Sequence, residues 1–363
     1  ATALDEAVER WRVPGVALAV FVDGRFDAAR SDLTELPEEL RVESLRETVA
    51  RDPSWLAERL GKHLDVEDQA FTALNAALWR DGLCVHAPAG LKVERPLQLL
   101  AIATGAERAV EIQLRHVIAV ERSAEVTLIE HYVGLDGRPV FENVVGEIEL
   151  ADNARLDRYK VELCARDGYH VGRVEGRQGR DSRLRSHVFS LGGQLLRDDF
   201  ASHLGGEGGD ATFNGLFLAD GERLVDHHTA IDHATPNCTS NELYKGILGD
   251  KSKGVFNGKV FVREGAQGTA AQQSNKNLLL SRSATINTKP QLEIWADDVK
   301  CTHGATVGQL DNDALFFLRA RGIGFEQARG MLIRAFAAEL LDGIRSLPLR
   351  MQLESELETR LGG

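Results

Sequence analysis

The sequence is poor in the residues that build covalent or metal-based frameworks. Its 363 residues include only four cysteines, Cys84, Cys164, Cys238 and Cys301, which lie far apart and form no Cys-x-x-Cys pair. In a chain of this size, such spacing argues against a disulfide framework and against a zinc knuckle. We therefore expect free thiols in a reducing compartment and a cytoplasmic location.

Long hydrophobic runs are also missing. No apolar run approaches the roughly 18–20 residues that a membrane-spanning helix needs. The first residues, ATALDEAVERW, are acidic and amphipathic, without the basic and apolar regions of a secretory signal.

The 43 basic and 55 acidic residues give a net charge of -12. This balance argues against nucleic acid or an anionic membrane as the main partner.

Familiar catalytic motifs are absent from the sequence. GGEGGD, at 205–210, is glycine-rich but lacks the lysine and the following helix of a phosphate-binding loop, so it is predicted as a flexible turn. The sequence contains no Gly-x-Ser-x-Gly nucleophile elbow. Asp297 and Asp298 are adjacent, and in a strand they would point to opposite faces, which is poor geometry for an acid–base couple.

The two ends of the chain are predicted to be helical. In residues 1–82, segments such as LRETVARDPSWLAERLGKHL place apolar residues at helical spacing, interrupted by a short hairpin that turns at Asp23-Gly24. Residues 312–363 open on an Asn/Asp cap and carry the apolar stripe MLIRAFAAELL. That stripe could cap a neighbouring structure or dock another protein. Three aromatic residues are expected in the core: Trp295, Phe316 and Phe317.

A repeat in residues 83–311 predicts a β-solenoid. Alternating segments such as RLDRYKVEL and KGVFNGKVFV are separated by Gly, Asp and Asn turns rather than by helices. A small or polar residue followed by alternating apolar positions recurs at steps of 30, 28, 28 and 31 residues, at Ala124, Ala154, Ser182, Asp210 and Asn241. A repeat of this length with strands alone favours a solenoid over a β-sandwich, the alternative for many short strands.

Cys301 and His303 are the first candidate site. In a strand, residues i and i+2 point to the same face, so the thiol and the imidazole would lie side by side, together with Val299. Both groups can ligate iron or zinc, but two ligands are too few for a closed site, so others would come from another segment or chain. A buried cysteine beside a hydrogen-bonded histidine is the structural alternative.

The densest histidine cluster is DHHTAIDHATPNC, at 226–238. His227 and His228 would face opposite sides of a strand, and Asp232 and His233 follow. These side chains could assemble a metal site, but they lack the helical spacing of a metalloprotease motif. Histidines stacked inside a solenoid turn and hydrogen-bonded to nearby backbone are the favoured interpretation.

Residues 226–323 resemble a known family. DHHTAIDHATPNCTSNELYKGIL, AQGTAAQQSNKNLLLS, ATINTKPQLEIWADDVKCTHGATVGQLD and FFLRARGI occur in the order found in the SufB/SufD family of iron–sulfur cluster assembly proteins. Within the family, the last long motif resembles SufD. SufB members tend to carry Glu-His-Glu where this chain has Cys301-Thr302-His303.

The resemblance implies a right-handed parallel β-helix flanked by helical segments. It implies a non-enzymatic scaffold that pairs with a SufB-like subunit through its last turns and docks a SufC-like ABC ATPase through its C-terminal helices. It further implies that His303, with Cys301 as its neighbour, contributes to a metal site shared with SufB. That site would hold transient iron or a nascent cluster, with no intrinsic cofactor and no flavin.

Two other functions remain open from the sequence. Polysaccharide-acting enzymes share the β-helix fold, but they typically show clustered Asp, Lys and Arg along one groove. A homodimeric structural protein could use the same solenoid edge to pair with itself. Chains of the resembled family are also expected to dimerise when isolated, so a dimer alone would not separate these functions.

Overall fold

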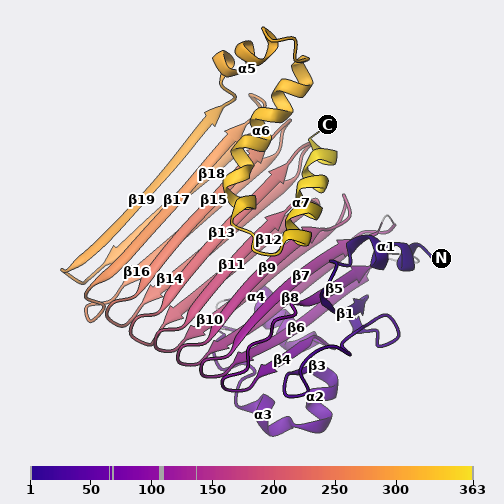
Figure 1. The fold of residues 1–363 in the computed structure, drawn as a ribbon, viewed down its shortest axis with the longest axis vertical. Helices are drawn as coiled ribbons and strands as arrows, with labels where there is room; N and C mark the ends of the chain where they lie inside the picture. The colour runs from indigo at the N-terminus through magenta and orange to yellow at the C-terminus, as the bar shows by residue number, and fades with distance from the viewer. Residues whose placement is uncertain (1, 65, 68, 106–109, 136, 362–363) are drawn as a thin grey trace.

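Alternation of inward apolar and outward polar side chains folds the middle of the chain into a solenoid of two parallel sheets (Figure 1). We examined a computed structural model, which describes residues 2–361 apart from 65, 68, 106–109 and 136. Burial in β14 (Leu224–His233) alternates strictly along the strand, as it does in β12 (Leu195–Leu204). The strand periodicity of the sequence is thus realised as one inward row per strand.

Odd-numbered and even-numbered strands separate into two sheets from β4 onward. Sheet A has ten strands in the order β19 (Val299–Gln309), β17 (Thr269–Leu279), β15 (Thr239–Leu248), β13 (Asp210–Ala219), β11 (Arg183–Ser190), β9 (Arg155–Leu163), β7 (Glu125–Gly134), β5 (Leu97–Ala103), β1 (Ala17–Val22) and β2 (Arg25–Phe26). Sheet B has nine strands in the order β18 (Thr285–Ile294), β16 (Lys253–Val262), β14, β12, β10 (Tyr169–Gln178), β8 (Val140–Leu150), β6 (Val110–Val120), β4 (Leu83–Ala87) and β3 (Arg41–Ser44). The helices are α1 (Ala3–Trp11), α2 (Leu45–Arg51), α3 (Pro53–Ala57), α4 (Ala70–Leu78), α5 (Asn312–Arg319), α6 (Phe325–Asp342) and α7 (Leu347–Arg360).

Each solenoid strand pairs in parallel with the strand two places before it and two places after it. β10, for example, pairs with β8 on one edge and with β12 on the other over its whole length. Parallel pairing of this kind requires the chain to cross to the opposite sheet between partners. The predicted parallel β-solenoid is therefore confirmed, and the sandwich alternative is wrong.

One corner of the solenoid is built from residues with left-handed backbone conformation. The amide of each donates to a carbonyl of the following turn, as from Ser123 to Asp152 and from Asn153 to Arg180. Asn, Asp and Gly tolerate this conformation better than other residues. The corner residues are Ser123, Asn153, Asp181, Gly208, Asn237 and Gly268.

This corner explains the sequence repeat and corrects its register. Ala124, Ala154 and Ser182 follow the left-handed residues and stack as predicted. Asp210, however, pairs with Arg183 rather than with Ser182, and Asn241 pairs with Thr212. The pattern of small and polar residues located the turns, but it missed shifts of one or two residues because neighbouring positions carry similar side chains.

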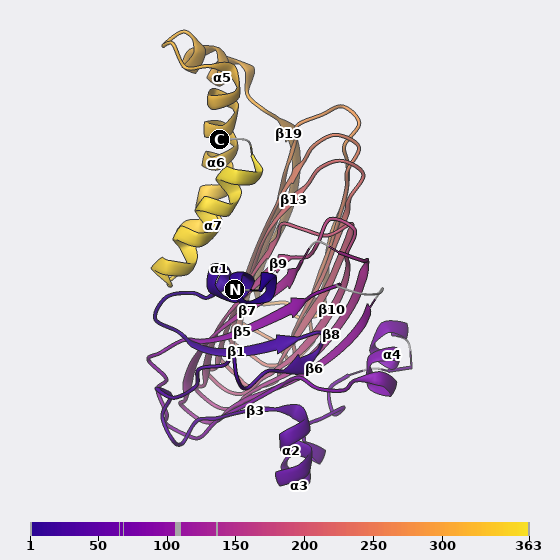
Figure 2. The ribbon, with the colours of Figure 1, turned by 90° about the vertical axis from the view of Figure 1, so that its right-hand side faces the viewer.

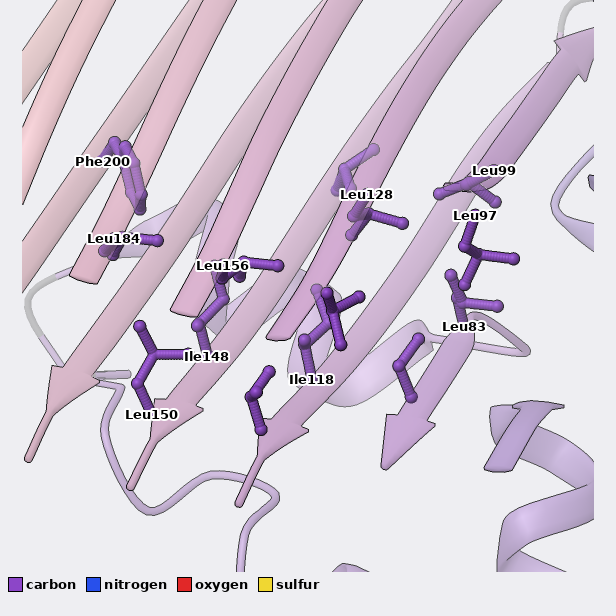
Figure 3. Close-up of a cluster of buried hydrophobic side chains, with 14 of the residues drawn as sticks. Leu83, Leu97, Leu99, Ile118, Leu128, Ile148, Leu150, Leu156, Leu184 and Phe200 are labelled. Atoms are coloured by element: carbon purple, nitrogen blue, oxygen red, sulfur yellow. The ribbon is translucent and has the colours of Figure 1, made fainter. Parts of the chain in front are cut away.

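The space between the sheets is apolar on one side and charged on another. Figure 3 shows part of the apolar side, where leucines and isoleucines from successive turns stack on one another. These side chains are removed from water and dominate the stability of the solenoid. The labelled members are Leu83, Leu97, Leu99, Ile118, Leu128, Ile148, Leu150, Leu156, Leu184 and Phe200.

The N-terminal region is mixed rather than purely helical. The hairpin predicted at Asp23-Gly24 is present, with φ of 47° and 77° at these residues, and it joins β1 to β2. β1 also pairs in parallel with β5, so it extends sheet A. This pairing is not evident from the sequence, because 74 residues separate the end of β1 at Val22 from the start of β5 at Leu97.

Helices α2, α4, α6 and α7 cover parts of the outer faces of the two sheets. α2 contacts β4 and β6, and α4 packs on β6 and β8 of sheet B. On sheet A, α6 packs against β13, and apolar residues of α6 and α7 share a buried cluster with sheet A and α1. Figure 2 shows α6 and α7 on one side of the solenoid and α4 on the other.

Candidate functional site

β19 carries Cys301 and His303 and forms the edge of sheet A (Figure 1). It pairs in parallel with β17 over all its residues, and within the described part of the chain no other strand pairs with it. The residues from Thr302 to Gln309 are exposed. An exposed edge strand presents unpaired backbone groups, which a strand from another chain can satisfy.

Cys301 faces the interior of the last turn. It pairs with Ala271 and packs, together with Val299, against a small apolar cluster that includes Val260 and Val262. Burial raises the pKa of the Cys301 thiol, although the Ala271 backbone amide opposes this shift. In the isolated chain this side chain is therefore a half-buried, protonated thiol.

His303 continues a polar inward row to the open end of the solenoid. In register it follows Gln273, which follows Glu242 on the preceding turn. Gln273 and Glu242 are each 1% exposed, and the Gln273 amide donates to the Glu242 carboxylate over 2.6 Å. His303, with no further turn above it, is exposed. The His303 imidazole therefore lies at the exposed end of a buried row of polar side chains.

Glu242 and Gln273 are site neighbours that the sequence analysis missed. Burial raises the pKa of Glu242 to about 7, against the hydrogen bonds from Thr229 and Gln273. A carboxyl group with such a pKa can exchange a proton near neutrality. The sequence signal for Glu242 is a glutamate at a position of β15 where the alternation predicts an inward-facing apolar residue.

Three aromatic residues expected in the core are exposed. Trp295, just after β18, is 51% exposed and lies beneath the Arg263 guanidinium, 5.3 Å from the ring centroid. Phe316 and Phe317 on α5 are 74% and 55% exposed. The expectation of burial was wrong, because large aromatic side chains occur in exposed apolar patches as well as in cores, and residue type alone does not separate the two.

α5 follows β19 almost directly. The Asp311 carboxylate accepts hydrogen bonds from the amides of Asp313 and Ala314 and so caps the first turn of α5. Gly322, with φ of 85°, lies in the connection that separates α5 from α6. A movement of these helices would therefore be transmitted to the strand that carries His303 through only Leu310 and Asp311.

The apolar stripe of α6 is used to hold the helix on sheet A. Ile333 and Ala337 are fully buried, and Lys245 of β15 donates to the carbonyl of Phe336 and pairs with Glu339, each over 2.7 Å. The stripe MLIRAFAAELL therefore has a structural role, but it covers the outer face of sheet A rather than the open end of the solenoid. Other apolar residues at the same end of the molecule are left uncovered, namely Phe316, Phe317, Phe325 and Met331.

The histidines of DHHTAIDH do not converge on one point. His227 and His233 are buried and contact the hydroxyls of Ser190 and Ser240, at 3.1 and 2.9 Å. His228 points the other way and pairs with Asp226 at 2.9 Å. The interior placement is as predicted, but the partners of the buried histidines are serine side chains. Within the described part of the chain, these residues form no metal-binding group.

No helix in the described ranges is both long and apolar enough to cross a bilayer. All four cysteines are free.

Comparison with known proteins gives matches along most of the chain. Residues 102–336 match the SUF system FeS cluster assembly, SufBD core domain, and residues 12–99 match the SufBD protein N-terminal region. An iron–sulfur cluster assembly SufBD family protein of Synechocystis is 35% identical over 349 residues, covering 94% of this chain and 77% of that protein. The iron–sulfur cluster assembly protein SufD of Escherichia coli is 35% identical over 346 residues, covering 95% and 79%. The chloroplastic protein ABCI7 of Arabidopsis thaliana is 30% identical over 315 residues, covering 84% and 66%.

Proposed function

Because the chain belongs to the SufBD family of iron–sulfur cluster assembly proteins, we propose that it is a SufD-like scaffold subunit of the SUF machinery without catalytic activity of its own. The observation that carries this proposal is the position of His303 on an exposed edge strand, at the open end of a buried polar row. We place the protein in the cytoplasm, where its four cysteines would stay reduced.

The free edge of β19 is the proposed pairing surface for a SufB-like subunit. Backbone groups along Thr302–Gln309 are exposed, and the neighbouring Trp295 adds an uncovered aromatic ring. Addition of a partner strand would satisfy those groups and continue the solenoid into the second chain. A second copy of this chain could use the same edge, so the isolated protein is expected to form homodimers.

His303 and Cys301 are the proposed contribution of this chain to a shared assembly site. Imidazole and thiolate are suitable ligands for iron. Cys301 and His303 are two residues apart in β19, so their side chains point to the same face of the strand. Iron, or a nascent cluster, is here the cargo of the machinery, and the remaining ligands would come from the SufB-like chain. Thiol ligation would remove the proton that burial retains on Cys301.

The uncovered apolar residues of α5 and the start of α6 are the proposed docking surface for a SufC-like ATPase, which would supply all nucleotide hydrolysis. Phe316, Phe317 and Phe325 are each about half exposed or more. ATP-driven dimerisation of two ATPase subunits would pull on α5 and, through Leu310 and Asp311, on β19. The interface would then open to admit iron or sulfide.

The test is co-expression of this chain with its SufB-like and SufC-like partners, followed by iron and sulfide analysis of the purified complex. We expect His303→Ala to assemble the complex but to remove most of its iron and acid-labile sulfide. Thr302→Ala, on the opposite face of the same strand, is the matched control and should keep both. Equal cluster content in the two variants would refute the role of His303.

A further inference from the structure

A group of buried ionisable side chains lies inside the solenoid, many turns away from β19. It is built by β8, β9, β10 and β12. The Lys160 ammonium is 2.5 Å from Asp198, 2.6 Å from Glu162 and 2.9 Å from the Nε2 atom of His170. One triad of potential ligands, Glu162, His170 and Asp198, is therefore already filled by a cation, the lysine side chain.

His170 faces a second triad through its other ring nitrogen. Its Nδ1 atom is 2.8 Å from the Glu142 carboxylate, and one ligand atom each of Glu142, His170 and Cys164 lie within 4.8 Å of one another. His170 is completely buried and Glu142 is 5% exposed. Within the described residues, no lysine or arginine is paired with Glu142.

The whole group carries more negative than positive charge. Three carboxylates, Glu142, Glu162 and Asp198, face the single ammonium of Lys160. Arg158, the next cation, is held by both oxygens of Glu130 and so offers little compensation. Burial and the charge of Glu162 raise the pKa of Asp198, and among the described residues no donor is hydrogen-bonded to its Oδ2 atom. Buried charges of one sign are costly unless a counter-ion balances them.

We propose that Glu142, Cys164 and His170 bind a divalent first-row transition metal such as Zn²⁺ or Fe²⁺. A carboxylate, a thiolate and an imidazole form a typical donor set for these ions. With the metal on Nδ1, the Nε2–H of His170 would donate a hydrogen bond to Glu162, 3.2 Å away, and so orient the imidazole. The Lys160 ammonium, now 2.9 Å from Nε2, would then turn to Glu162 and Asp198 alone. The Cys164 thiol, which burial keeps protonated, would lose its proton on metal binding.

The backbone around the group accommodates its charged side chains, and one of the proposed ligands borders a surface pocket. Gly172 makes space for the charged group, because a Cβ atom there would lie 2.1 Å from Asp198 and 2.6 Å from Lys160. Cys164 also lines a surface pocket of about 550 Å³ together with Gly192 and Gly193. Cys164 is thus the member of the triad that borders a surface pocket, from which an ion would enter.

Cobalt(II) is the probe for this site, because a cobalt–thiolate bond absorbs in the near ultraviolet. Metal-free protein should develop this band with one equivalent of Co²⁺ and release protons as it does so. Cys164→Ser should abolish the band, and Glu142→Gln should weaken cobalt binding at least about tenfold while its thermal melting remains close to wild type.

The control variant is Cys238→Ala, at a buried free cysteine outside both proposed sites, which should leave the cobalt band unchanged. A band that survives in Cys164→Ser, or that disappears in Cys238→Ala, would overturn the interior site. Absence of any band at saturating Co²⁺ in folded wild-type protein would do the same. The inference is independent of the scaffold role, since neither result changes the cluster content expected for His303→Ala.

Discussion

The two ends of the solenoid differ in how far they are covered by other elements. At the N-terminal end, β3 closes the edge of sheet B and the β1–β2 hairpin closes that of sheet A, while α2 and α4 cover nearby strands. At the C-terminal end, β18 and β19 remain largely exposed on their outer edges. An uncapped solenoid end exposes both backbone and apolar surface. The covered end protects the edges of both sheets, whereas the open end is the surface that we propose for a partner.

The largest effect is expected from the charged interior near the covered half. Arg158→Ala would leave Glu130 buried without its partner, since their atoms lie 2.6–2.8 Å apart. Breaking a buried pair in this way costs about 3–5 kcal/mol of the free energy of unfolding. Urea unfolding checks this, and Arg263→Ala, whose pair with Asp232 is solvent-exposed, should cost less than about 1 kcal/mol.

The apolar interior of the covered half should be nearly as sensitive. Leu156 is completely buried within the cluster of Figure 3, so Leu156→Ala is expected to cost about 2–5 kcal/mol of unfolding free energy. Val307→Ala on β19, where the side chain is 50% exposed, should change it by less than about 0.5 kcal/mol. Equal losses in the two variants would show that the open end is as tightly packed as the covered one.

Acid should destabilise the protein through its buried histidines. Burial lowers the pKa of His187 from 6.5 to about 4, so the unfolded chain binds this proton first as the pH falls. Stability is therefore full above about pH 6.5 and is lost between that pH and about 4, by on the order of 3 kcal/mol for this residue. His187→Phe should flatten this part of the pH profile of unfolding. An unchanged slope would mean that burial does not lower the pKa of His187 in the folded protein.

The smallest effect on stability is expected at the open end, with a selective effect on binding. Phe316→Ser should leave the melting temperature unchanged, because the ring is 74% exposed, yet weaken the affinity for the SufC-like ATPase at least about tenfold. Calorimetric titration measures this affinity. Leu347→Ser, at an apolar residue on α7 that is 63% exposed, is the control and should bind normally.

Sequence periodicity predicted the solenoid because every strand has one inward row, and it placed Cys301 and His303 on one face of β19 without establishing their role. It could not predict the charged interior. Arg158 and Glu130 occupy inward positions that alternation assigns to apolar residues, and only the stacking of turns brings them together. It also failed for Phe316, since composition does not show whether a partner covers an aromatic side chain.

Amide hydrogen exchange along β19 tests whether the open end of the solenoid is the pairing surface for a SufB-like subunit. In the isolated chain, amides of Thr302–Gln309 that are not bonded to β17 should exchange quickly. Adding the SufB-like subunit should slow exchange in β19, while adding the SufC-like ATPase alone should slow it in α5 and the start of α6. Formation of a stable complex with unchanged exchange in β19, and with protection on another surface, would contradict the proposal that the open end is the pairing site.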